Sequence, residues 1–145
     1  MFIENLAETL NLGKQLSQKL NPQSIILLQG PIGAGKTSLV KGIAQGLSIS
    51  EDITSPTFAL SHHYKSGKIP LIHLDLYRLE NISSAKEVFY SEEEEALQSK
   101  AILVIEWPEL IESYIENFWK IKISYANNYG RLYEIRDPKN LLTFS

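Results

Sequence analysis

The chain has 145 residues, of which 43% are hydrophobic and 21% charged, ordinary values that exclude a disordered or fibrous protein. With 14 basic and 17 acidic residues the net charge is −3, so no basic surface for tight, independent nucleic-acid binding is expected. There is no cysteine, which excludes disulfides, thiolate nucleophiles and cysteine-based metal sites. No signal peptide or membrane-spanning stretch is recognisable, so we expect a cytoplasmic protein without a membrane partner.

The first third of the chain predicts a helix, a buried strand and a second helix. Residues 5–20 have helical spacing of leucines, with Asn5 as the cap and Glu8 three residues later. Residues 24–29 contain four consecutive apolar residues without alternation, as expected of a parallel strand covered on both faces. After a glycine-rich turn, residues 36–47 return to helical spacing.

The rest of the chain predicts two hairpins, a short helix and another buried strand. Pro108 is expected to bias Trp107 toward extended geometry and so to end that strand, and the glutamates at 92–95 are expected to be solvated. The elements are a hairpin of residues 59–64 and 69–75, a short helix opened by the capping-box spacing of Ser84 and Glu87, a strand at 101–106, and a hairpin of 119–124 and 131–135.

The glycine-rich turn, Gly-Pro-Ile-Gly-Ala-Gly-Lys-Thr at residues 30–37, matches the P-loop pattern G-x-x-x-x-G-K-[ST] in full. It lies between a predicted strand and a predicted helix, which is the context that a phosphate-binding loop requires. The alternative is a chance glycine turn, but four fixed positions rarely coincide. We therefore expect a single α/β domain over residues 1–145 with a P-loop NTPase fold: a mostly parallel central sheet, flanking helices and antiparallel hairpins.

The P-loop implies defined roles for its residues. Backbone amides at Gly33, Ala34 and Gly35, followed by Ser38 in the helix, are expected to surround the phosphates. Lys36 would supply a positive charge to the β- and γ-phosphates of ATP, and Thr37 a hydroxyl ligand for Mg²⁺.

Two carboxylates are candidates for holding Mg²⁺ or the attacking water. Asp75 and Glu106 each end an apolar run, which places them at the carboxyl ends of strands. The alternative for either is a solvated acid that only ends a strand. Residues 54–58 (Thr-Ser-Pro-Thr-Phe) are placed where P-loop proteins often sense the γ-phosphate, although a simple turn fits equally well.

The class of P-loop protein is narrowed by what is missing. The Asn-Lys-x-Asp motif of GTPases does not occur, and only three arginines, Arg78, Arg131 and Arg136, are available to clamp a transferred phosphate. A small-molecule kinase and a nucleotide-gated binding module with negligible turnover remain alternatives to an ATPase.

The ordered motifs resemble the TsaE (YjeE-type) ATPases of bacterial tRNA threonylcarbamoyladenosine (t6A) synthesis, and the resemblance covers nearly the whole chain. The motifs are the P-loop, Ser-Pro-Thr-Phe at 55–58, His-Leu-Asp-Leu-Tyr-Arg-Leu at 73–79, and Ile-Glu-Trp-Pro-Glu at 105–109. The last two of these motifs, at 73–79 and 105–109, are highly specific to the family. The segment 84–100 departs from the family pattern, because it lacks the usual Leu-Gly and carries four consecutive glutamates.

This resemblance implies a small ATPase, weak alone and stimulated by partners. It would act on a TsaD-like threonylcarbamoyl transferase and its TsaB-like companion, and would contact tRNA only through that complex. Carried onto this chain, Lys36, Asp75, Glu106 and Thr57 are the catalytic residues, and Thr37 and Glu106 hold the metal. Thr9 and Arg131 join the P-loop residues in nucleotide binding, and Tyr77 and Arg78 are expected to line the partner surface rather than brace the site.

Overall fold

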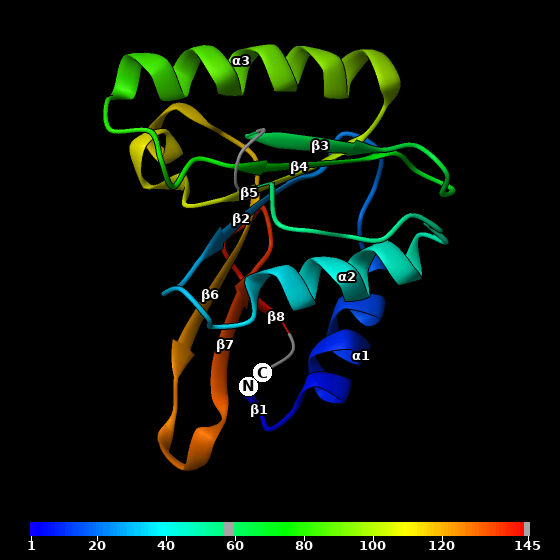
Figure 1. The fold of residues 1–145 in the computed structure, drawn as a ribbon, viewed down its shortest axis with the longest axis vertical. Helices are drawn as coiled ribbons and strands as arrows, with labels where there is room; N and C mark the ends of the chain where they lie inside the picture. Colours follow the sequence, from blue (N-terminus) through cyan, green and yellow to red (C-terminus); the bar gives the residue numbers. More distant parts are fainter. Residues whose placement is uncertain (57–59, 144–145) are drawn as a thin grey trace.

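The computed structural model describes residues 1–56 and 60–143 and has one mixed eight-stranded sheet between two layers of helices (Figure 1). Helices α1 and α2 cover one face of the sheet, and α3 covers the other. The helices are α1 (Leu6–Ser17), α2 (Lys36–Gly46) and α3 (Ile82–Ser99), with short 3-10 turns η1 (Pro108–Leu110), η2 (Glu112–Tyr114) and η3 (Asn127–Tyr129). The strands are β1 (Phe2–Ile3), β2 (Ile25–Gln29), β3 (Ser61–Tyr64), β4 (Leu71–Asp75), β5 (Ile102–Glu106), β6 (Trp119–Tyr125), β7 (Arg131–Arg136) and β8 (Leu142–Thr143).

The sheet is parallel in the centre and antiparallel at both edges, in the order β1-β7-β6-β2-β5-β4-β3, with β8 also beside β7. The parallel pairs are β2 with β5, β2 with β6, and β4 with β5. Strands β3 and β4 form one predicted hairpin, and β6 and β7 form the other. The fold class expected from the sequence is therefore correct.

The apolar runs of the central strands supply two cores because alternate side chains point to opposite faces of a sheet. In β2, Ile26 and Leu28 join the core under α1 and α2, whereas Leu27 joins the core under α3. All three side chains are fully buried. This explains why β2 and β5 show no polar alternation in sequence.

Helices α1 and α2 pack with their backbones in close approach. A Cβ added at Gly13 would lie 2.7 Å from backbone atoms of Gly42, and one added at Gly42 would lie 2.5 Å from the carbonyl oxygen of Leu10. The two glycines thus let α1 lie directly against the P-loop helix. As predicted, Asn5 caps α1 by accepting a hydrogen bond from the backbone N–H of Glu8, although the helix ends at Ser17 rather than at residue 20.

Helix α3 differs from the expectation of a short helix capped at Ser84. It begins at Ile82, after Asn81 accepts a hydrogen bond from the N–H of Ser84, and it continues for 18 residues. The predicted cap was wrong because Asn81 supplies a carboxamide three residues earlier in the chain. The glutamate run lies in the second half of the helix, where Glu92 contacts β3 while Glu94 is exposed. Among the described residues no helix is long and apolar enough to cross a membrane.

Candidate nucleotide-binding site

The P-loop connects β2 to α2, and two of its glycines adopt conformations that other residues rarely take. Gly33 has φ +80° and Gly35 has φ +105°. With this backbone, successive N–H groups can point to the same side of the loop and form an anion-binding nest. Helix α2 starts immediately afterwards, and none of the side chains that the structure describes caps its N-terminus. Its first N–H groups therefore remain available to an anion.

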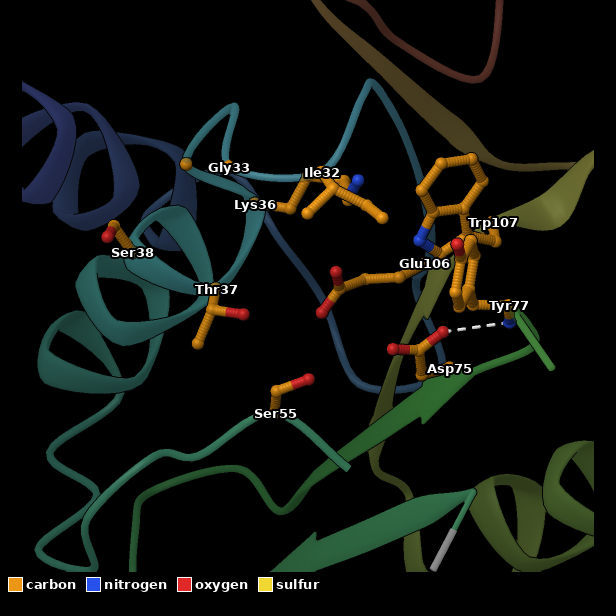
Figure 2. Close-up of a pocket in the computed structure, with 11 residues that line it drawn as sticks. Ile32, Gly33, Lys36, Thr37, Ser38, Ser55, Asp75, Tyr77, Glu106 and Trp107 are labelled. Atoms are coloured by element: carbon orange, nitrogen blue, oxygen red, sulfur yellow. Dashed lines mark hydrogen bonds between the residues drawn. The ribbon is translucent and has the colours of Figure 1, made fainter. Parts of the chain in front are cut away.

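A cavity of about 440 Å³ lies beside the P-loop at the carboxyl ends of β4 and β5 (Figure 2). This is the edge at which open α/β sheets bind ligands. The residues that line the cavity are Ile32, Gly33, Gly35, Lys36, Thr37, Ser38, Ser55, Asp75, Tyr77, Glu106 and Trp107.

Lys36 is folded back onto the P-loop. Its Nζ donates hydrogen bonds to the carbonyl oxygens of Gly30 and, at 3.1 Å, of Pro31. It also lies 4.2 Å from the ring centroid of Trp107, a cation–π distance. Burial lowers the pKa of Lys36, and the negative charges of Glu106, Asp75 and Glu109 oppose that effect. An ammonium group is thus held at the wall of the cavity by neutral partners that an anionic ligand could replace.

The two candidate acids are neighbours across two parallel strands. Asp75 of β4 and Glu106 of β5 are register partners, so both side chains leave the sheet on the same face. Asp75 Oδ1 accepts a hydrogen bond of 2.9 Å from the N–H of Tyr77. Burial raises the pKa of Asp75 above its ordinary value, the hydrogen bond from Tyr77 opposes this, and the charge of Glu106 adds to the rise. Two carboxylates this close favour binding of a cation between them.

The oxygen groups in the cavity suit Mg²⁺. Figure 2 shows the carboxylate of Glu106 directed toward the hydroxyl of Thr37, with Asp75 and Ser55 beside it. Mg²⁺ prefers oxygen ligands and usually binds one or two carboxylates together with substrate phosphates. Within residues 1–56 and 60–143, no group of three or more His, Cys, Asp or Glu side chains could hold a metal alone. The donor set therefore fits a Mg²⁺ ion that shares its ligands with a nucleotide.

Trp107 does not have the extended geometry expected before Pro108. Its φ of 57° and ψ of 59° are left-handed, which is rare for a large side chain. The effect of proline falls mainly on the right-handed helical region, and here the chain turns directly from β5 into η1. The turn brings the indole to the wall of the cavity, 4.8 Å from the ring of Tyr77 between centroids.

A second cavity, of about 230 Å³, lies on the other side of the P-loop. Thr9 of α1 and Arg131 of β7 both line it, together with Gly33, Ala34 and Gly35. Two residues that are 122 positions apart in the chain are thus brought to one face of the loop. The two cavities share Gly33, Gly35 and Ser38, so the P-loop forms the wall between them.

The tip of the β6–β7 hairpin contacts the P-loop directly. The hydroxyl of Tyr125 donates a hydrogen bond of 2.5 Å to the carbonyl oxygen of Ile32. The guanidinium of Arg131 lies 4.5 Å from the ring centroid of Tyr125 and donates to the carbonyl oxygen of Gly33 at 3.4 Å. This contact fixes the position of Arg131 relative to the loop.

The segment predicted to sense the γ-phosphate, residues 54–58, lies partly outside the described residues. Ser55 lines the first cavity, and the preceding Thr54 is held by Tyr64, whose hydroxyl accepts from the N–H of Thr54 at 3.3 Å. The predicted catalytic residue Thr57 lies outside the described residues.

Comparison with known proteins identifies the family. A family model described as "Threonylcarbamoyl adenosine biosynthesis protein TsaE" matches residues 3–133. The chain belongs to the TsaE family. A protein from Nostoc named tRNA threonylcarbamoyladenosine biosynthesis protein TsaE is 42% identical over 137 residues, covering 93% of this chain and 83% of its own. A protein of the same name from Synechocystis is 47% identical over 112 residues, covering 74% of this chain and 69% of its own.

A solved structure also matches this TsaE-family chain. The crystal structure of YdiB from Bacillus subtilis aligns with a TM-score of 0.72 and 28% sequence identity, covering 90% of this chain and 79% of that one. The resemblance stated from the sequence motifs is therefore confirmed, both in family and in fold.

The TsaE-family chain brings most of its predicted site residues to the P-loop. Lys36, Thr37, Ser38, Asp75 and Glu106 line the first cavity, and Thr9, Ala34 and Arg131 line the second.

The positions of several tyrosines near the site were not predicted from the sequence. Tyr77, expected at a partner surface, lines the first cavity and is half exposed, so the expected partner contact stays a prediction. Tyr125 and Tyr129 had no signal beyond their position at a hairpin tip. The contact of His73 with Glu106 could have been found, because a residue two positions before Asp75 on a strand shares its face.

Proposed function

We propose that this TsaE-family chain is a Mg²⁺-dependent P-loop ATPase that serves as an accessory subunit in t6A synthesis. The observation that carries the proposal is the convergence of an uncapped helix N-terminus, Lys36, Thr37 and two adjacent carboxylates on one cavity. A triphosphate supplies the negative charge that the nest and Lys36 attract, and it supplies the remaining oxygen ligands for Mg²⁺. Bound Mg²⁺ neutralises charge on the phosphates.

In this proposal Lys36 exchanges its bonds to Gly30 and Pro31 for phosphate oxygens. The carbonyl contacts are neutral, and charge-assisted hydrogen bonds to phosphate are roughly twice as strong. Thr37 and Glu106 hold the metal, and Asp75 stands beside them to orient water. Thr57 is proposed as the residue that senses the γ-phosphate, as in the resemblance stated from sequence.

The second cavity is proposed to take the nucleoside. It adjoins Gly33 and Gly35 on the side opposite the carboxylates, so a nucleotide whose phosphates lie in the loop can extend its ribose and base there. Arg131 and Thr9 supply a planar cation and a hydroxyl at this position.

The biological setting follows from the family. Similar proteins carry the name tRNA threonylcarbamoyladenosine biosynthesis protein TsaE. We propose TsaD-like transferase and TsaB-like companion proteins as the partners, with tRNA contacted only through them. The net charge of −3 supports this indirect role, because the chain offers no excess of positive charge for tRNA phosphates.

The proposal is tested by reconstitution. Calorimetry should detect binding of ATP with Mg²⁺, and addition of the protein with ATP to cognate TsaB and TsaD should restore repeated rounds of tRNA modification. No heat at millimolar nucleotide would remove the nucleotide-binding function. Binding without any effect on the transferase would remove the accessory role alone.

The alternatives are separated by the fate of the γ-phosphate. An ATPase releases labelled phosphate as the free ion, whereas a small-molecule kinase transfers it to a metabolite. A nucleotide-gated binding module would bind its partners differently with ATP and ADP while releasing almost no phosphate.

A further inference from the structure

A histidine with no role in the proposed site lies directly beneath it. His73 of β4 is fully buried, and it does not line the nucleotide cavity. It is two residues before Asp75 on the same strand, so the two side chains share the face that carries the P-loop helix. Packing alone would favour an apolar residue at such a position, since a buried polar group is costly unless it is hydrogen-bonded.

The imidazole is bonded to one of the two candidate acids. Its Nε2 lies in hydrogen-bond contact with Oε2 of Glu106, and both side chains are nearly inaccessible to solvent, at 0% and 4% exposed. Asp75 is the register partner of Glu106, so His73 reaches Glu106 diagonally across the β4–β5 pair. Of the two carboxylates, it is Glu106 that the histidine contacts.

The other ring nitrogen shows which tautomer the site requires. Nδ1 of His73 has no hydrogen-bond partner among the described residues. With the proton on Nε2, the ring donates to Glu106 and leaves only a lone pair at Nδ1. A proton on Nδ1 would bury an unpaired N–H, which is the costlier arrangement.

We propose that His73 is the positioning residue for Glu106: by donating from Nε2 to Oε2, it fixes the carboxylate so that Oε1 faces the cavity beside Thr37. This inference rests on the proposed ATPase function. His73 acts through Glu106 and does not touch nucleotide, metal or water. Its role is that of the outer partner that orients a metal-linked ligand, and loss of such partners typically lowers metal affinity or activity by about 10- to 100-fold.

Without His73, Glu106 has a competing partner. This partner is Lys36. Of the neighbouring negative charges that raise the pKa of Lys36, the charge of Glu106 has the largest effect. A carboxylate released from the histidine can turn toward this ammonium and away from Thr37. Loss of His73 therefore weakens the use of Mg²⁺ without removing the phosphate nest.

The test compares two variants at this position with a matched control. His73→Leu removes the donor, whereas His73→Gln keeps an N–H at about the position of Nε2. The control is His63→Leu, which breaks another His–Glu pair, between His63 Nε2 and Glu92 Oε2 at 2.7 Å, on the edge strand away from the cavity.

We expect His73→Leu to lower kcat for ATP about tenfold or more and to raise the Mg²⁺ concentration for half-maximal activity. ATP affinity without Mg²⁺, measured by calorimetry, should change less than about twofold, and the gain in affinity on adding Mg²⁺ should shrink. His73→Gln should recover most of the lost kcat, and His63→Leu should match the wild type. Long-range ¹H–¹⁵N NMR of the wild type should show His73 protonated at Nε2.

Several results would overturn this role. The first is protonation of His73 at Nδ1 only. The second is equal impairment of the His73→Gln and His73→Leu variants when both are folded. The third is a His73→Leu variant with wild-type kcat and Mg²⁺ dependence. If the wild type itself neither binds nor hydrolyses ATP, the proposed function fails and this inference with it. If the wild type hydrolyses ATP and His73→Leu does so equally, only the role of His73 fails.

Discussion

Asp75 and Glu106 face the same cavity from neighbouring parallel strands, as direct register partners. Their like charges oppose each other across the two strands. Burial, helped by the charge of Glu106, raises the pKa of Asp75. The site thus holds electrostatic strain that a bound cation relieves.

Asp75→Asn should stabilise the free protein, because it removes a half-buried carboxylate whose charge opposes that of Glu106. A raised pKa means that the folded protein binds this proton more tightly than the unfolded chain does. The stability contributed by the protonated group is fully present below the unfolded pKa and is lost as the pH rises through the folded pKa. Urea unfolding should therefore show the variant more stable than wild type at about pH 7, with the difference shrinking toward about pH 4. Asp52→Asn, at an exposed position, is the control and should show no such trend.

Lys36→Ala should lower ATP affinity at least about 100-fold, because charge-assisted hydrogen bonds contribute about 1.5–3 kcal/mol each. Calorimetry measures the change. Lys41→Ala removes an equal charge from the exposed side of the same helix and should bind ATP normally. Equal ATP affinity in Lys36→Ala and wild type would refute the assigned role.

Glu106→Ala should reduce Mg²⁺-dependent hydrolysis about 100-fold or more while ATP binding without Mg²⁺ persists. The physical reason is that the carboxylate contributes to the metal and not to the phosphate nest. Single-turnover phosphate release gives the rate. The control is Glu109→Ala, an exposed acid whose charge also acts on Lys36, and it should retain hydrolysis.

Arg131→Ala should weaken binding of ATP about tenfold and leave binding of inorganic triphosphate unchanged, because the guanidinium lines the second cavity and not the first. Competition calorimetry with the two ligands measures the difference. Arg136→Ala, at the other end of β7, should affect neither. An equal loss for both ligands would place Arg131 at the phosphates instead.

Gly42→Ala should destabilise the fold by about 1–3 kcal/mol, the usual cost of overpacking, since the added methyl group would meet the backbone of α1. Urea unfolding of the free protein checks this. A change below about 0.5 kcal/mol would show that α1 can move away from the P-loop helix at little cost.

The elements that the sequence predicted well are those whose own residues determine them. Strand β2 is apolar from Ile25 to Leu28 and is covered on both faces, and the glycines of the P-loop are required by its backbone. Strands β1 and β8 have two residues each and exist only by pairing with β7, so no local pattern could reveal them. Helix α3 was underestimated because it buries few side chains, Ala85, Phe89 and Ala96, and its glutamates fit a solvated helical face or a loop equally well.

The candidate site likewise contains residues that local sequence patterns predict and residues that only the tertiary fold brings together. Lys36, Thr37, Asp75 and Glu106 follow from motifs and strand ends. Thr9 and Arg131 came only from the family resemblance, because their proximity depends on the packing of α1 and the hairpin against the loop. The conformation of Trp107 depends on the turn into η1, which the rule for residues before proline did not anticipate.

The P-loop separates two cavities, and this division determines which part of the protein surface can differ between the ATP-bound and ADP-bound states. A nucleoside bound beside Thr9 and Arg131 is the same in ATP and ADP. In the proposed binding mode, the γ-phosphate that distinguishes ATP from ADP lies in the first cavity, near Ser55 and the half-exposed Tyr77. In this binding mode, a partner that responds to hydrolysis contacts the rim of the first cavity. A partner that docks only on the β6–β7 hairpin can detect a bound nucleotide but cannot distinguish ATP from ADP.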